Sequence, residues 1–341
     1  MGKIRARSGS VRRRFGWVDP FVLLLLATLA AATLWPPRGW VGPVLSTAAG
    51  IAVGLQFFIS GLRLPPSAAL QGAKAWRPHL VIVAFSFAAF PLLGLGVAAG
   101  SSWFLSRELV AGLLFLTMLP TAVQTATTFT GIAGGNTALA VCAASISNLL
   151  GVVATPLLAA LVLGSFGGLH ADAVFKIALQ IIAPFMAGQL LHKPLARWTV
   201  RRATTLKAVD RSAILLVVYG AFGAAVAGGL WQQIPPAQLA VTAGICAALL
   251  ALVLSATSLM ARRLGFERAD ATAVLFCGSQ KSLASGLPLS AILFQGPLAG
   301  VVILPVIMYH AMQLIVCAAV ARRLARRGEQ TVAKPPLDAF A

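Results

Sequence analysis

A lysine and three polar neighbours interrupt an apolar stretch that runs from 268 to 294. Lys281 follows Ser279 and Gln280, precedes Ser282, and lies 13 residues from either end of the stretch. In a helix that rises about 1.5 Å per residue, it would lie roughly 20 Å from each end. An ionisable side chain at that depth in a bilayer is costly and usually faces a cavity or a partner. We therefore predict that these four residues line a binding site for an ion or a polar solute.

Two chemical roles fit the position of Lys281. As a fixed cation, it would take the place of a bound metal ion and pair with an anionic solute. As an amine that loses and regains a proton, it would couple the movement of that solute to protons. A third alternative is that the long side chain reaches the membrane surface, as lysines near helix ends do. The distance from both ends favours the first two roles.

A second polar cluster follows Pro120 in the apolar stretch from 107 to 133. Its members are hydroxyl and amide residues, five within eight positions: Thr121, Gln124, Thr125, Thr127 and Thr128. Such side chains often bridge neighbouring transmembrane helices, so helix packing is one explanation. Their number, and the proline beside them, favour the alternative that they line the same site as Lys281.

Two further polar residues lie in the stretches that follow these clusters. Asn148 is in the stretch from 136 to 164, and His310 is in the stretch from 297 to 322. We predict that both belong to the site. His310 could relay protons, because histidine titrates near neutral pH, or it could hold a hydrogen bond as a structural residue.

The sequence contains no arrangement of residues that is typical of catalysis. The four cysteines lack CxxC spacing, the four histidines are scattered, and none of the eight acidic residues lies at the depth of Lys281. Membrane enzymes need an acid pair, a metal-ligand cluster, or a nucleophile with a nearby base. We therefore predict that the protein is not an enzyme and that it holds no metal site and no cofactor.

The elements that must position these residues are long and apolar. Of the 341 residues, 59% are hydrophobic and 10% are charged, whereas soluble domains carry roughly 25% charged residues. A helix needs about 20 mostly apolar residues to span a bilayer. Ten stretches meet or approach this length: 19–36, 42–61, 78–100, 107–133, 136–164, 172–192, 207–229, 237–261, 268–294 and 297–322. The sequence therefore predicts an all-α integral membrane protein with ten transmembrane helices.

The basic residues are sorted by membrane side. With the N-terminus in the cytoplasm, 23 of the 27 Lys and Arg fall in cytoplasmic segments, which is the positive-inside pattern. This sorting predicts that both termini are cytoplasmic, and it explains the net charge of +19 without a nucleic-acid partner. The Arg-rich segments at 12–14 and 322–327 are predicted to contact anionic lipid headgroups. The Arg- and Ala-rich composition favours a bacterial inner membrane.

The two interrupted stretches are the fourth members of two groups of five. Lipid cannot satisfy the backbone groups that Pro and Gly release, so such helices line protein or a watery cavity. Because five is odd, the second group has inverted topology, which is typical of secondary transporters with a site at the midplane. The predicted division is a basic cytoplasmic tail (1–18), a first repeat (19–164), a second, inverted repeat (165–322) and a cytoplasmic tail (323–341).

Several segments resemble the bile acid:sodium symporter family, in particular its divergent SBF-like branch, which is related to the seventh member of the human bile-acid carrier family. They cover nearly the whole chain in order: 60–64, 120–141, 148–157 and 276–288. The resemblance implies a fold similar to that of sodium/proton antiporters, with a core domain, a panel domain and two broken helices that cross near the midplane. It also implies alternating access of small, usually anionic, organic solutes.

The chain departs from the family pattern at 125–127, at Ala140 and Ala144 and, with the greatest bearing on the coupling ion, at two positions of the stretch from 268 to 294. The Glu-x-Gly-x-Gln-Asn stretch of sodium-coupled members falls on 276–281, where Phe276 replaces the acidic ligand and Lys281 replaces the asparagine. The loss of the carboxylate disfavours sodium as the coupling ion. We therefore predict a secondary transporter of a small organic anion, with a midplane lysine in place of the usual sodium-site residues. Sodium coupling as in a bile-acid symporter, proton coupling, and a non-transporting membrane regulator stay open as alternatives.

Overall fold

The computed structural model describes residues 20–63, 75–163, 171–294 and 297–332, and every regular element in these ranges is a helix. In chain order the helices are α1 (Pro20–Leu34), α2 (Val41–Arg63), α4 (Trp76–Ala84), the π-helix η2 (Phe85–Ala89), α5 (Phe90–Ser101), α6 (Arg107–Met118), α7 (Val123–Ile132), α8 (Thr137–Leu163), α9 (Ala171–Arg201), α10 (Ala203–Ala227), α11 (Leu230–Gln233), α12 (Pro236–Arg263), α13 (Arg268–Ser279), α14 (Leu283–Leu293) and α15 (Pro297–Val332). The predicted all-helical fold class is confirmed.

Six helical runs are long and apolar enough to cross a membrane. They are α2, the run from α4 through η2 to α5, α8, α10, α12 and α15. The pair α6 and α7 makes a seventh if it is counted as one span with a bend of 60°. The chain is therefore an integral membrane protein. The described parts of α1, of α9 and of the pair α13 and α14 do not meet this criterion, so the count of ten spans stays a prediction.

Two helices continue past the ends that were predicted for them. α9 extends from 192 to Arg201, and α15 extends from 322 to Val332. Both extensions are rich in Lys and Arg, which are good helix formers. The apolar stretch therefore ends at these charges, whereas the helix does not. The predicted N-terminal tail (1–18) and the end of the C-terminal tail (333–341) lie outside the described residues.

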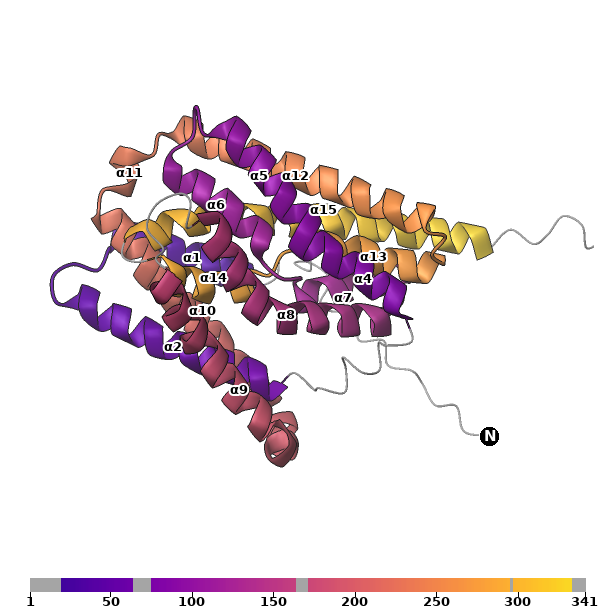
Figure 1. Cartoon of the computed structure of the whole chain (residues 1–341), viewed down its shortest axis with the longest axis horizontal. Helices are drawn as coiled ribbons and strands as arrows, with labels where there is room; N and C mark the ends of the chain where they lie inside the picture. Colours follow the sequence, from indigo (N-terminus) through magenta and orange to yellow (C-terminus); the bar gives the residue numbers. More distant parts are fainter. Residues whose placement is uncertain (1–19, 64–74, 164–170, 295–296, 333–341) are drawn as a thin grey trace, which may run out of the picture.

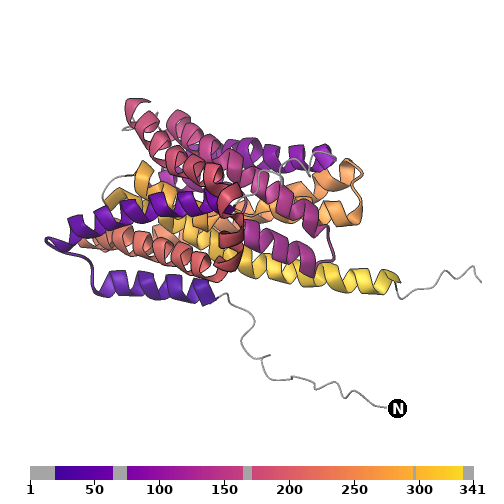
Figure 2. The same cartoon turned by 90° about the horizontal axis from the view of Figure 1, so that it is seen from below.

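The helices pack in two groups, which contact each other directly through α10 and α15 and through α8 and α9. In the first group α2 packs against α9 and α10, and α1 packs against α10. The second group contains α4 to α8, α12, α13 and α15. Figure 1 shows α2 and α9 on one side of the molecule and α4, α5 and α12 on the opposite side, and Figure 2 shows the same helices from below. α14 lies between the groups, because it contacts α2 and α10 as well as α8 and α15.

The close packing of α2 against α9 depends on two glycines. A Cβ atom at Gly61 would collide with the carbonyl oxygen of Phe185, and a Cβ atom at Gly188 would collide with the carbonyl oxygen of Phe58. Gln189 adds a hydrogen bond here, since its Nε2 donates to the Gly61 carbonyl at 2.7 Å. Small residues let helix backbones approach each other in membranes. The backbones of α2 and α9 are therefore in direct contact at these two glycines.

We expect the substitution Gly61→Leu to lower the free energy of unfolding by at least about 3 kcal/mol, the upper end of the usual cost of overpacking. The obstacle is the backbone of α9, which cannot move aside as a side chain could. Gly54→Leu, in the same helix, is the matched control, because a Cβ atom there meets nothing within 4 Å. Thermal unfolding in detergent measures both. Equal midpoints for the two variants would contradict the packing role of Gly61.

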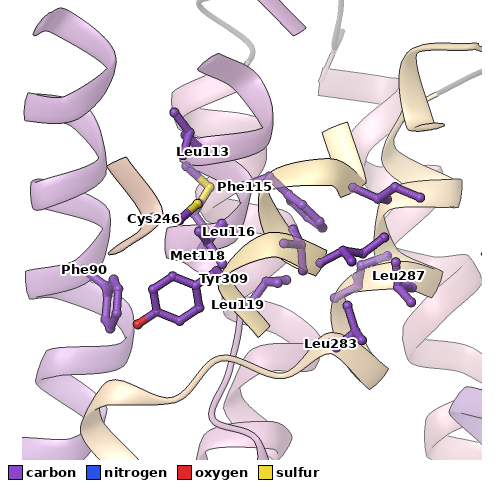
Figure 3. Close-up of a cluster of buried hydrophobic side chains, with 14 of the residues drawn as sticks. Phe90, Leu113, Phe115, Leu116, Met118, Leu119, Cys246, Leu283, Leu287 and Tyr309 are labelled. Carbon is purple, nitrogen blue, oxygen red and sulfur yellow. The ribbon is translucent and has the colours of Figure 1, made fainter. Parts of the chain in front are cut away.

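The buried interior surrounds the C-terminal half of α6. Phe115, Leu116 and Met118 have no exposed surface. Figure 3 shows that Phe90 of α5 and Tyr309 of α15 face each other close to Met118. The two rings meet edge to face, with their centroids 6.2 Å apart. This apolar cluster encloses the point at which α6 ends, and the candidate site is built there.

Candidate functional site

α6 ends at Met118 because Pro120 follows. Proline has no N–H and restricts the residue before it to an extended conformation. Leu119 is extended accordingly, with φ −71° and ψ 150°. The chain becomes helical again at Val123, so residues 119–122 form a break between α6 and α7. This break lies within the predicted fourth span.

Side chains of α8 satisfy the backbone groups that the first break releases. Thr155 Oγ1 donates to the Met118 carbonyl at 2.8 Å. The Thr121 N–H donates to Ser147 Oγ at 3.0 Å, and Asn148 Nδ2 donates to the Thr121 carbonyl at 2.7 Å. Unpaired backbone groups are costly at membrane depth. α8 therefore fixes the conformation of the first break.

The second break, at 280–282, separates α13 from α14. Gln280 is extended, with φ −92° and ψ 140°, and Ser282 Oγ caps α14 by accepting from the Ser285 N–H at 3.2 Å. Gln313 of α15 holds the backbone of Lys281 on both sides. Its Oε1 accepts from the Lys281 N–H and its Nε2 donates to the Lys281 carbonyl, each at 2.9 Å.

The two breaks contact each other and form one hydrogen-bonded junction. The Ser282 N–H donates to the Pro120 carbonyl at 2.8 Å, and the Thr125 hydroxyl donates to Oε1 of Gln280. Residues that are about 160 positions apart in the sequence therefore meet at one place. We call the two breaks and these contacts the junction.

The ammonium group of Lys281 is enclosed in the junction, where the residue is 2% exposed. Its Nζ donates to three backbone carbonyls, those of Ser86 at 2.9 Å, Thr117 at 2.8 Å and Leu119 at 2.8 Å. The ring of Phe90 covers it, with Nζ 4.1 Å from the ring centroid. These three acceptors use all three N–H groups of a lysine ammonium. In the described part of the chain, no carboxylate lies within ion-pair distance of Nζ.

Each of the three carbonyls lies at an irregularity in a helix. Thr117 and Leu119 lie at the end of α6, where carbonyls have no partner further along the helix. Ser86 lies in η2 (Phe85–Ala89), and π-turns inside α-helices are frequent at functional sites. The C-terminal end of a helix also carries a partial negative charge. The ammonium therefore satisfies released acceptors and compensates the charge of the α6 terminus.

A cavity of about 450 Å³ lies beside the junction. α2, α9 and α10 form one wall, and α7, α8 and α14 form the opposite wall. Lys281 is not among the residues that line it. The cavity therefore lies between the first group of helices and the junction, while the ammonium lies behind its surface.

Two groups of polar side chains in the cavity lie well apart along α2. At the junction, Gln56 Nε2 donates to the carbonyl of Ala284 in α14 at 2.8 Å. Arg63 lies seven residues further along α2, roughly 10 Å away at about 1.5 Å per residue. Lys207 and Arg211 of α10 lie near it, and Arg63 and Lys207 are exposed. We call Arg63, Lys207 and Arg211 the basic end of the cavity.

One acidic residue accompanies the basic end. Asp210 Oδ2 lies 3.9 Å from Nη1 of Arg63, and Asp210 also lines the cavity. Three cationic side chains and one carboxylate leave this end with a net positive charge. Because Arg63 and Lys207 are exposed, this end of the cavity lies at the surface of the molecule.

The residues predicted from the sequence fall into three sets. Five line the cavity: Gln124, Thr125, Asn148, Ser282 and His310. Four are buried in the junction: Thr121, Ser279, Gln280 and Lys281. The remaining two, Thr127 and Thr128, donate to carbonyls of their own helix four residues earlier and do not line the cavity. The structure thus brings most of the set together, and binding by these residues stays a prediction.

His310 links the cavity to the second break. Its Nδ1 lies 2.7 Å from Nε2 of Gln313, the same amide nitrogen that donates to the Lys281 carbonyl. Because an amide nitrogen can only donate, Nδ1 accepts and the proton of the neutral ring lies on Nε2. The hydrogen bond that a structural histidine requires is therefore present. His310 also lines the cavity, so proton transfer there stays a prediction.

Sequence reasoning missed part of the cavity. Ser285 lines it and donates from Oγ to Oδ1 of Asn148 at 3.0 Å. Gln56 lines it from α2, and its polarity within an apolar stretch was the available signal. The basic end was explained by the charge sorting of the loops alone. Its position at the cavity depends on how α2 packs against α10.

Comparison with known proteins identifies the family. The model of the SBF-like CPA transporter family matches residues 19–326. The chain belongs to this family. An uncharacterised protein of Pseudomonas aeruginosa is 44% identical over 317 residues, which are 92% of this chain and 95% of the relative. The Escherichia coli protein named "Putative symporter YfeH" is 40% identical and covers 94% and 97% of the two chains.

A vertebrate relative is more distant. Sodium/bile acid cotransporter 7 of Rattus norvegicus is 28% identical over 311 residues, which are 86% of this chain and 89% of that protein. The resemblance to an SBF-like branch, inferred from the sequence segments, is thereby confirmed. The family is one of membrane transporters, as its description states.

Proposed function

We propose that this protein is a secondary transporter that moves a small organic anion by alternating access. The cavity beside the junction carries the proposal. It joins two broken helices to a basic end at the surface of the molecule, within a chain whose family consists of transporters. Broken helices that meet near the centre of the membrane are where transporters of this general design bind their solutes.

The packing of the helices supports two inverted repeats. The end of α7 meets the start of α13, since the Asn136 N–H donates to the Ala269 carbonyl at 2.9 Å and Asn136 Nδ2 donates to Asp270 Oδ1 at 2.8 Å. α7 leads away from the first break, and α13 leads toward the second. Because the far end of α7 meets the start of α13, these two half-helices lie side by side and run in opposite directions. In our proposal, α1, α2, α9 and α10 form the panel domain, and the second group forms the core domain.

The lining of the cavity supports an amphipathic monoanion as the solute. The basic end would hold a carboxylate or sulfonate, for which Arg is well suited. Phe57, Phe185 and Ile214 supply apolar surface between the ends. At the junction, Gln56 and Asn148 would hydrogen-bond a polar group roughly 10 Å from the anionic group.

In this proposal Lys281 does not pair directly with the solute. Its three N–H groups already donate to backbone carbonyls, and it does not line the cavity. The ammonium instead stabilises the junction against which the solute rests. A cation attached to the chain would make a dissolved coupling ion unnecessary at that place, so we propose transport without sodium.

The proposed location is a bacterial inner membrane with both termini in the cytoplasm. Charge sorting places Arg63 and the start of α10 on the cytoplasmic side. The cavity would then open to the cytoplasm in this conformation. Anionic lipid headgroups would contact the Arg-rich end of α15.

Ligand-dependent thermal unfolding of the purified protein tests the proposal. We expect amphipathic carboxylates or sulfonates to raise the unfolding midpoint with saturation. The corresponding methyl esters and alcohols should have no effect, because they lack the charge that the basic end recognises. A panel of such anions that leaves the midpoint unchanged would contradict anion binding and would favour a regulatory membrane protein.

We expect the double substitution Lys207→Ala and Arg211→Ala to raise the KM for the anion at least about tenfold, the factor that corresponds to losing one charge-assisted contact. The unfolding midpoint should change little, since Lys207 is exposed and Arg211 is partly exposed. Lys193→Ala is the matched control, because Lys193 is exposed on α9 and does not line the cavity. An unchanged KM in the double variant would exclude Lys207 and Arg211 as the anion site.

A further inference from the structure

We infer that the carbonyls of Ser86, Thr117 and Leu119 form a binding site for a small monovalent cation, in which Lys281 is a cation attached to the chain. The site is separate from the cavity, because Lys281 does not line it. When the lysine side chain is removed, the site should accept a free cation: a primary alkylammonium, ammonium or an alkali ion.

The surroundings of Nζ have the chemistry of a cation site. Three carbonyl oxygens lie at 2.8 to 2.9 Å, and an aromatic face lies at 4.1 Å. Backbone carbonyls that replace a hydration shell hold potassium in ion channels, and aromatic faces attract ammonium groups. With no carboxylate within ion-pair distance among the described residues, the site offers partial charges only. Such a site suits a single positive charge.

The backbone around the acceptors is held by contacts that do not involve the lysine side chain: Ser86 Oγ lies 3.2 Å from Thr121 Oγ1, and the residues that flank Leu119 are fixed by α8. Thr155 holds the Met118 carbonyl, and Asn148 holds the Thr121 carbonyl, on either side of Leu119. Gln313 fixes the second break through the backbone of residue 281, so any side chain at that position keeps this clamp. The three acceptors should therefore stay converged after Lys281 is replaced, and the vacated space would favour a cation.

Chemical rescue of the Lys281→Ala variant tests the inference. Alanine removes three carbons and the nitrogen of the lysine side chain, and n-propylammonium has the same four heavy atoms. The full-length variant is solubilised and purified in choline chloride, n-propylammonium chloride, ammonium chloride, potassium chloride or sodium chloride at equal ionic strength. Choline has no N–H group and is too bulky for the site. Thermal unfolding is then measured as each cation is titrated.

We expect n-propylammonium to raise the unfolding midpoint of Lys281→Ala by at least about 4 °C over choline, with saturation, as for a ligand that binds only the folded state. Ammonium or potassium should give a smaller shift. The wild type should show no cation-specific shift, since its site is filled. Lys281→Met should show none either, because its side chain occupies the same space without a charge. Uncharged n-propanol should not replace n-propylammonium.

Two results would overturn the inference. One is a Lys281→Ala protein whose midpoint is the same in all five salts, or shifts only as much as that of Lys281→Met. The other is a Lys281→Ala protein that cannot be recovered folded in any of the cations. Recovery in n-propylammonium but not in choline would support it. The readout is stability, so it neither requires nor tests movement of a solute through the cavity.

Discussion

Lys281→Met is expected to lower the free energy of unfolding by at least about 3 kcal/mol and to reduce solute uptake at least about 100-fold. Methionine preserves most of the side-chain volume but leaves three buried carbonyls without a donor, and each unpaired group costs about 1–3 kcal/mol. It also removes the positive charge at the C-terminal end of α6. The same loss of about 3 kcal/mol, taken from the junction in the step that limits transport, corresponds to a roughly hundredfold lower uptake rate. Thermal unfolding and uptake into proteoliposomes measure the two effects.

The variant Lys281→Arg separates charge from geometry. A planar guanidinium keeps the charge but cannot point its donors at three carbonyls that converge on one nitrogen. We expect its stability and uptake to lie between those of wild type and Lys281→Met. Wild-type stability and uptake in Lys281→Met would show that the ammonium is dispensable, contrary to the role given to it here.

Asn148→Leu is expected to reduce uptake about 10- to 100-fold with a smaller loss of stability than Lys281→Met. The amide of Asn148 donates to the Thr121 carbonyl at 2.7 Å and accepts from Ser285 Oγ at 3.0 Å, so it connects the first break to the start of α14 at the surface of the cavity. Leucine has a similar size and makes neither contact. Losing them costs about 1–3 kcal/mol of junction stability, which corresponds to that range of uptake rates.

Ser145→Ala is the control for this prediction, because Ser145 also lines the cavity from α8 but contributes to neither break. It should retain most of the uptake. Asn148→Asp is expected to be as inactive as Asn148→Leu, since the carboxylate cannot donate and repels an anion. Full uptake by Asn148→Asp would show that neither the hydrogen bond to the first break nor the sign of the charge matters at this position.

Much of the junction could be predicted from the sequence because its causes are local. Pro120 removes an N–H wherever it lies, so a helix break in the fourth span follows from the residue itself. The polar cluster beside it and the group around Lys281 indicated two breaks at equivalent places. Their contact, through Ser282 and Pro120, then followed from the expectation of paired broken helices in two repeats.

The partners of Lys281 could not be predicted in this way. One of its three acceptors, the Ser86 carbonyl, lies in the π-helical turn η2. Pro91, five residues later, has no N–H and signals an irregular helix there, but nothing local shows that Lys281 fills the released acceptor. The depth of the lysine is a property of the sequence, whereas the direction of its ammonium depends on how α5, α6 and α13 pack. The expectation that it would face a solute therefore had no support from local sequence.

The cavity was also beyond prediction from local patterns, since its walls come from helices far apart in the chain. Arg63 ends α2 and Lys207 lies near the start of α10, and both fit a simple rule of membrane topology. Only the packing of α2 against α10 brings them to one opening. The same packing brings polar residues such as Gln56 to the junction.

The most direct test of the central claim is uptake of labelled amphipathic carboxylates and sulfonates into proteoliposomes that contain the purified protein, with sodium and pH gradients imposed separately. We predict saturable uptake of at least one such anion in sodium-free buffer, reduced at least about 100-fold in liposomes that contain Lys281→Met. Uptake that requires a sodium gradient would contradict the role of the tethered ammonium. No uptake of any anion by folded protein, under either gradient, would contradict transport itself.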